Sequence, residues 1–233
     1  ERKNIVGIQA QVVDPKYVYI RVNSEVNFNS DALSTSMESL KLRVKNAILN
    51  FGDTSLEKFE KGLRYSKLIK EIDDVDDSIL SNETKISMEY RLYPVTDPVK
   101  ASYNIDFSNP LYHPHDGHSS IISSTAFNYT EVSDTTTRES YLDDDGNGNL
   151  RTWFYLDGVK TIINTKIGTI NYETGNLYLS NIIINSILED NFIKIIAQPE
   201  NKDIDSKKDT MLIVDSDDGG SVTVTATPST YLT

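Results

Sequence analysis

Hydrophobic and polar residues alternate along the segment 16–29, KYVYIRVNSEVNFN. The apolar positions are Val18, Ile20, Val22, Val26 and Phe28, and the polar residues between them are Arg21, Asn23, Glu25 and Asn27. Successive side chains of a strand point to opposite faces of a sheet, so a period of two indicates one buried face and one solvated face. The segment is predicted to be a half-buried strand.

The period changes in the segment 37–51, MESLKLRVKNAILNF, where apolar residues follow helical steps of three and four. Thr35 and Glu38 have the spacing of a capping box ahead of it. Gly52 and Asp53 are expected to end this helix.

A second helix is predicted from about Leu63 to Ile72, with its apolar residues on one face. The segment 72–79, IDDVDDSI, follows with four aspartates. Carboxylates are unfavourable at the negative end of a helix, so the chain is expected to leave the helix there. The next segment, TKISMEYRLYP, alternates like a strand and is expected to stop at Pro94.

Short segments rich in β-branched and aromatic residues follow from about residue 98, separated by Gly, Asn and Asp. They occupy residues 102–108, 123–132, 151–157, 161–181, 191–199, 210–216 and 221–227. Within the fourth of them, a hairpin is predicted to turn at Glu173 to Asn176. The predicted class is therefore α+β, with a strand-helix-helix-strand unit in a first domain (1–97) and short antiparallel strands in a β-rich second domain (98–233).

Composition narrows the range of partners. The 233 residues are 38% apolar and carry a formal net charge of −12, so nucleic acid and anionic lipid would both repel the protein on average. No basic run exceeds two residues, and no apolar run approaches the roughly 20 residues that span a bilayer. The absence of cysteine excludes disulfides, thiolate zinc sites and cysteine nucleophiles. We expect no nucleic acid and no membrane as a partner.

The stretch YLDDDGNGNL begins like the calcium loop of a helix-loop-helix protein. The residues at loop positions one, three, five, six and eight are Asp143, Asp145, Asn147, Gly148 and Leu150. Position twelve should be a glutamate that closes the coordination sphere, and here it is Phe154. The flanking segments also alternate like strands, so the stretch is interpreted as a turn between two strands, with weak cation binding left open.

All three histidines lie in LYHPHDGHSS, at His113, His115 and His118. The segment is similar to the H-x-H-x-D-H motif of metallo-hydrolases, but the aspartate is one place early at Asp116 and Gly117 stands in its place. A catalytic zinc needs three protein ligands with an open position, and such hydrolases take more ligands from distant histidines that this chain lacks. An ordered surface loop is the preferred interpretation.

Other catalytic motifs are absent from the sequence. It contains no G-x-S-x-G, no phosphate-binding loop with its lysine and no G-x-G-x-x-G after a strand. We therefore predict no catalytic residues, no metal ligands and no cofactor.

Two consecutive blocks resemble the C-terminal part of baseplate wedge proteins from contractile-tailed phages, a family related to the baseplate J-like proteins. They are VNSEVNFNSDALSTSMESLKLRVKNAILNF and LEKFEKGLRYSKLIKEIDDVDDSILSNETKISMEYR. The resemblance continues more weakly in FSNPLYHPHDGHSSIISSTAF and IGTINYETGNLYL.

The resemblance implies a non-enzymatic structural protein located in the virion tail baseplate and assembled in the host cytoplasm. It also implies a C-terminal fragment of a longer wedge subunit that pairs with itself as a homodimer and contacts other baseplate wedge proteins, joining wedges into the inner ring. Two alternatives remain open from the residues: a calcium-dependent carbohydrate-binding or adhesin module, and a metal-dependent hydrolase built on the three histidines.

Overall fold

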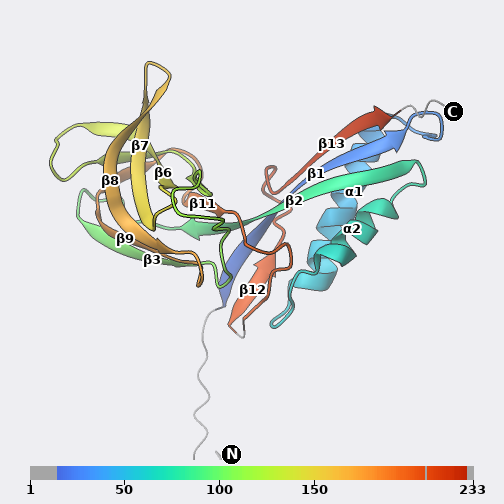
Figure 1. Cartoon of the computed structure of the whole chain (residues 1–233), viewed down its shortest axis with the longest axis horizontal. Helices are drawn as coiled ribbons and strands as arrows, with labels where there is room; N and C mark the ends of the chain where they lie inside the picture. Colours follow the sequence, from blue (N-terminus) through green and yellow to red (C-terminus); the bar gives the residue numbers. More distant parts are fainter. Residues whose placement is uncertain (1–14, 208, 230–233) are drawn as a thin grey trace, which may run out of the picture.

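The computed structural model describes residues 15–207 and 209–229, and its elements form two β-sheets (Figure 1). The first sheet has the strand order β12-β1-β2-β11-β4, and β13 also pairs with β1. The bounds of these strands are β1 Lys16–Asn29, β2 Ile79–Leu92, β4 Ile122–Ser124, β11 Ile193–Ala197, β12 Thr210–Ile213 and β13 Val222–Ser229. Both long strands were predicted, and β1 has the predicted bounds.

The second sheet is antiparallel throughout, with the order β10-β5-β6-β7-β8-β9-β3. Its strands are β3 Ala101–Asp106, β5 Phe127–Thr130, β6 Thr137–Asp144, β7 Asn149–Leu156, β8 Val159–Asn171, β9 Asn176–Ile182 and β10 Ile184–Ile187. The predicted hairpin turn lies between β8 and β9, as expected.

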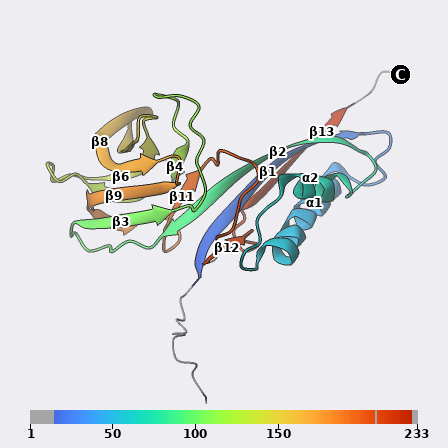
Figure 2. The same cartoon turned by 60° about the horizontal axis from the view of Figure 1, so that its bottom comes forward.

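The helices are α1 Met37–Phe51 and α2 Tyr65–Asp73, and a π-helical turn η1, Gly52–Leu56, continues α1. Both α-helices lie on one side of β1, β2 and β13 (Figure 2). Leu40, Val44 and Ile48 of α1 are fully buried together with Val18 and Ile20 of β1. The apolar stripe of the helix and the apolar face of the strand thus form one core.

The start of α1 differs from the predicted capping box. The N-cap is Ser36 and not Thr35, and the Ser36 hydroxyl accepts a hydrogen bond from the backbone N–H of Ser39 at 3.2 Å. The α2 helix begins two residues later than predicted because Leu63 forms a β-bridge with Ile204 instead.

The predicted α+β class is wrong: strand residues, isolated bridges included, make up 48% of the described structure and helical residues, η1 included, 14%, so the protein is mostly β. The physical reason lies in β11, β12 and β13. These strands come from the last part of the sequence and complete the sheet of β1 and β2, and the helices cover only one face of that sheet. The division into domains 1–97 and 98–233 stays a prediction, and residues 1–14 of it lie outside the described residues.

Candidate interaction sites

The two motifs that the sequence singled out for metal chemistry lie against each other. The backbone N–H of Gly117, in the histidine segment, donates to the carbonyl of Gly146, in the β6–β7 turn, at 2.9 Å. Gly146 has φ of +71° and packs against the backbone of His118. The histidine segment and the β6–β7 turn therefore form a contact between two loops.

Asp143 forms an ion-paired contact within the second sheet. Its buried carboxylate accepts from the guanidinium of Arg151 at 3.0 and 2.8 Å and from Lys160 Nζ at 2.5 Å. Arg151 lies directly opposite Asp143 in the β6–β7 ladder. Because two cations already neutralise this carboxylate, it is poorly suited to a calcium ion.

Asp145 organises the turn between the two strands. Its carboxylate accepts from the backbone N–H groups of Asn147 and Asn149 at 2.8 and 3.0 Å, and from the side-chain amide of Asn149 at 2.8 Å. Burial raises the pKa of Asp145, but the hydrogen bonds from Asn149 and Asn147 outweigh it and hold the pKa below its usual value. The predicted turn between two strands is therefore present, closed by an aspartate side chain.

Asp144, which the sequence reasoning passed over, is the fully buried residue of the three aspartates. One carboxylate oxygen accepts from the Ser120 hydroxyl and from the backbone N–H groups of Ile121 and Ile122, at 2.6, 2.8 and 2.9 Å. The other accepts from the Tyr172 hydroxyl at 2.8 Å and the backbone N–H of residue 146 at 3.3 Å. Asp144 thus fastens the segment after the histidines to the second sheet.

Tyr172 connects this carboxylate to the histidines. Its ring stacks on His113 with centroids 4.3 Å apart and planes 5° apart. Burial, and then the hydrogen bond to Asp144, raise the pKa of the Tyr172 phenol. The phenol therefore remains a hydrogen-bond donor.

The imidazoles are largely occupied with one another and with the backbone. His118 Nδ1 donates to the carbonyl of Ser119 at 2.7 Å, and His118 Nε2 and His113 Nδ1 share a hydrogen bond of 2.9 Å. His115 Nδ1 donates to the carbonyl of Asp116 at 2.9 Å. Across residues 15–207 and 209–229, no group of three His, Asp or Glu side chains has the geometry to hold a metal ion.

Replacing Gly146 with alanine tests the contact between the two loops. A Cβ at this position would lie 2.5 Å from the backbone nitrogen and oxygen of His118, and the backbone has a left-handed φ. We expect Gly146→Ala to lower the free energy of unfolding by about 2–3 kcal/mol, measured by urea denaturation. Gly158→Ala is the matched control, because φ is +79° there and the added Cβ meets nothing within 4 Å. Equal losses in the two variants would contradict a role for the contact.

A network of charged side chains lies near the face of the first sheet that the helices leave uncovered. Glu89, only 1% exposed, accepts from Arg21 at 2.5 Å and from Arg91 at 3.0 Å. Both arginines also reach Asp218, at 3.3 and 4.0 Å, and Arg91 pairs with Asp215. Burial raises the pKa of Asp215, but the hydrogen bonds from Arg91 and from the backbone of Asp217, together with the charge of Arg91, hold the pKa below its usual value. The network joins β1 and β2 to the loop between β12 and β13.

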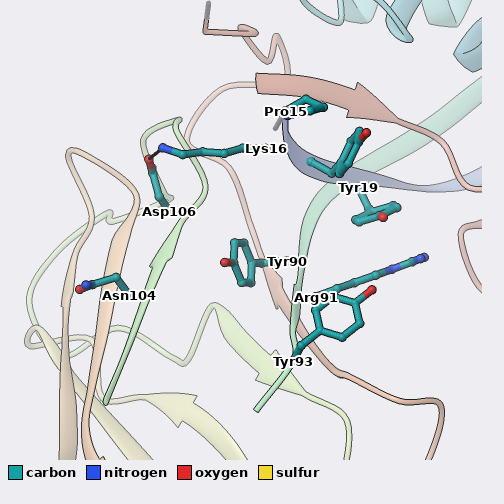
Figure 3. A pocket seen from close by; sticks show the side chains of 9 residues that line it. Pro15, Lys16, Tyr19, Tyr90, Arg91, Tyr93, Asn104 and Asp106 are labelled. Carbon is teal, nitrogen blue, oxygen red and sulfur yellow. Dashed lines mark ion pairs between the residues drawn. The ribbon is translucent and has the colours of Figure 1, made fainter. Parts of the chain in front are cut away.

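A cleft of about 630 Å³ opens beside this network, between the two sheets (Figure 3). Four tyrosines line it, together with Pro15, Lys16, Arg91, Asn104 and Asp106; the tyrosines are Tyr17, Tyr19, Tyr90 and Tyr93. The Arg91 guanidinium lies 3.6 Å from the centre of the Tyr19 ring, and Lys16 pairs with Asp106 at 3.8 Å across one side. Burial raises the pKa of Tyr90.

The cleft is lined by aromatic rings together with hydroxyl and guanidinium groups. This composition is typical of protein interfaces, where Tyr and Arg are enriched. The sequence of β1 contains a signal for this cleft. Tyr17 and Tyr19 occupy the positions of β1 that alternate with its buried residues, where polar side chains were expected.

None of the helices in the described ranges is long and apolar enough to cross a membrane.

The comparisons with known proteins concern mainly the segment that carries β1 and both helices. Residues 16–90 match the family model described as baseplate structural protein gp6, C-terminal domain III. These residues run from the start of β1 through both helices into β2. Baseplate wedge protein gp6 of Enterobacteria phage T4 is 25% identical over 85 residues, which cover 36% of this chain and 13% of that protein.

The chain thus corresponds to a small part of the length of this relative. Both matches agree with the expected resemblance and with the expected location in the virion tail baseplate. Through residues 16–90, the chain is similar to the C-terminal domain III of the gp6 baseplate structural proteins, and this similarity supports a baseplate wedge subunit.

Proposed function

We propose that this protein is a non-enzymatic structural component of a phage tail baseplate wedge, which self-associates and joins wedges into the inner baseplate ring. The observation that carries the proposal is the correspondence between the gp6-like segment and the sheet that bears the Glu89 network. A sheet joined by hydrogen-bonded ion pairs presents a preorganised surface, which lowers the entropic cost of docking a partner.

The groups with catalytic potential support the same proposal. Asp143, Asp144 and His118 are all at least nine-tenths buried, and their side chains form hydrogen bonds within the chain. Groups fixed in this way stabilise a scaffold and are poorly placed to bind a substrate or a cation.

Two exposed features suit contacts with other baseplate wedge proteins. The first is the cleft lined by tyrosines. The second is the tip of the β7–β8 hairpin, which projects from the second sheet (Figure 1) and exposes Tyr155, Leu156 and Val159 by 58%, 53% and 66%. An apolar tip on an otherwise acidic protein is a favourable anchor for a partner.

Light scattering coupled to size-exclusion chromatography tests the self-association. We expect the mass of the 233-residue chain to rise from monomer to dimer as its concentration increases from about 1 to about 50 µM, the range expected for a specific but modest interface. A monomer mass throughout this range would contradict the proposed self-association. Adding the other wedge proteins of the same phage should then give a larger complex.

A further inference from the structure

We propose that the cleft between the two sheets binds an arginine side chain of a partner protein, with the guanidinium among its tyrosine rings and beside its carboxylates. This inference rests on the contacts with other baseplate wedge proteins proposed above, and it adds the chemistry of one such contact.

The cleft has the size and the lining of a site that encloses a side chain. Its volume of about 630 Å³ lies within the range of roughly 300–1,000 Å³ that is typical of pockets that hold a ligand. Tyr17 and Tyr93 are 42% and 61% exposed, and Tyr19 and Tyr90 are partly buried. Aromatic surface is therefore open to solvent inside the cleft.

A guanidinium of the chain itself already contacts one of these rings. The Cζ atom of Arg91 lies 3.6 Å from the centre of the Tyr19 ring. A cation within about 6 Å of an aromatic ring centre is attracted by the negative potential of the ring face. In the part of the chain that the structure describes, no cation lies over the rings of Tyr17, Tyr90 or Tyr93. These three rings are available to a second cation.

Carboxylates outnumber cations on the side of the cleft where β1 begins. Lys16 lies 3.8 Å from Asp106 and 3.3 Å from Asp209, so one ammonium group has two carboxylate partners. In the view of Figure 3, the Tyr90 ring projects into the cleft between the Lys16–Asp106 pair and Arg91. A cation that stacks on Tyr90 would thus also lie near this pair.

The charged network on the other side of the cleft has the same sign. It contains two arginines and three carboxylates, namely Arg21, Arg91, Glu89, Asp215 and Asp218. Lys194 and Asp190 extend it by one charge of each sign. The whole chain carries a net charge of −12, so the local and the overall charge both favour a basic group over an acidic one.

Arginine suits this combination of groups better than lysine. Its guanidinium is planar, stacks on aromatic faces and is more weakly hydrated than an ammonium group, so it loses less hydration on entering the cleft. Its five N–H donors form a fork that matches a carboxylate such as that of Asp106, whose side chain is 31% exposed. The tyrosine hydroxyls can accept further hydrogen bonds.

A titration with N-acetyl-argininamide tests the site in the full 233-residue chain, with the tyrosine ring signals followed by NMR. We expect saturable shifts with a dissociation constant of about 1–10 mM. N-acetyl-citrullinamide is the matched probe, because its neutral ureido group has the shape of a guanidinium without the charge, and it should bind at least about 10-fold more weakly. Equal binding of the two probes, or no saturable shift up to about 50 mM argininamide, would overturn the inference.

Substitutions in the lining test the location of the bound probe. Tyr17→Leu combined with Tyr93→Leu removes two exposed rings and should raise the dissociation constant at least about 5-fold, whereas Tyr155→Leu at the hairpin tip should leave it unchanged. Asp106→Asn removes a charge but keeps the oxygen that accepts from the backbone N–H of Ser108 at 2.7 Å, and should weaken binding about 3-fold. Circular dichroism establishes that each variant is folded. Unchanged affinity in the double tyrosine variant would contradict the inference.

Binding of the other wedge proteins, followed by light scattering, separates this inference from the proposed function. If they bind the unaltered chain at least about 5-fold more tightly than the double tyrosine variant, the cleft is their docking site. If they bind both equally well, the inference is wrong and the structural role stands. If none of them binds the unaltered chain, the proposed contacts are wrong even where argininamide binds.

Discussion

Replacing Asp144 with alanine is expected to lower the free energy of unfolding by about 3–5 kcal/mol, the largest effect of any single substitution considered for the second sheet. The change leaves five hydrogen-bond donors without their acceptor, and they belong to Ser120, Ile121, Ile122, Gly146 and Tyr172. Because Asp144 is fully buried, water cannot replace the carboxylate without opening the loop. Urea denaturation followed by circular dichroism measures the loss.

The neighbouring aspartate provides the control. Asp145→Ala removes hydrogen bonds within the turn only, at a partly exposed position, and should cost about 1 kcal/mol. Asp144→Asn keeps one oxygen and most of the volume, so it should fall between the two alanine variants. A loss for Asp144→Ala no greater than that for Asp145→Ala would show that the carboxylate does not fasten the loop.

The second large effect is expected for Glu89→Ala, which should lower the free energy of unfolding by about 3 kcal/mol. Its carboxylate lies between Arg21 and Arg91, and without it the two guanidinium groups face each other beside a buried cavity. Asp215 and Asp218 still pair with them, which keeps the loss below that of an isolated buried charge. The measurement is again the free energy of unfolding in urea.

Glu83→Ala on the same strand is the matched control for Glu89. Among the residues that the structure describes, Glu83 pairs with Lys85 alone, at 3.9 Å, and its side chain is 70% exposed, so its loss should change the free energy of unfolding by less than about 0.5 kcal/mol. In Glu89→Ala, by contrast, Arg91 loses the carboxylate that holds its guanidinium against the Tyr19 ring, so the side chains that line the cleft should become more mobile. Similar losses for the two glutamates would contradict the proposed role of the network.

The candidate site shows where reasoning from the sequence stops. Counting positions in YLDDDGNGNL correctly predicts a turn between two strands. The two features behind this prediction are local: Phe154 stands where a calcium loop has a glutamate, and apolar and polar residues alternate on both sides of the stretch. The same count selects Asp143 and Asp145 and passes over Asp144. Which of three consecutive aspartates is buried depends on the loop of residues 113–122 that covers one face of β6, and no local pattern contains that information.

The sequence by itself determined the local elements of this protein. The alternation of β1 and the three-and-four spacing of α1 predict both elements with the observed bounds, since each period reflects the burial of one face. The tertiary structure decided the class of the fold. Pairing of β1 with β12 and β13, nearly two hundred residues away, arises from backbone hydrogen bonds that any strand of suitable length can offer. Periodicity identifies which face of a strand is buried, but the choice of a distant partner depends on how the whole chain packs.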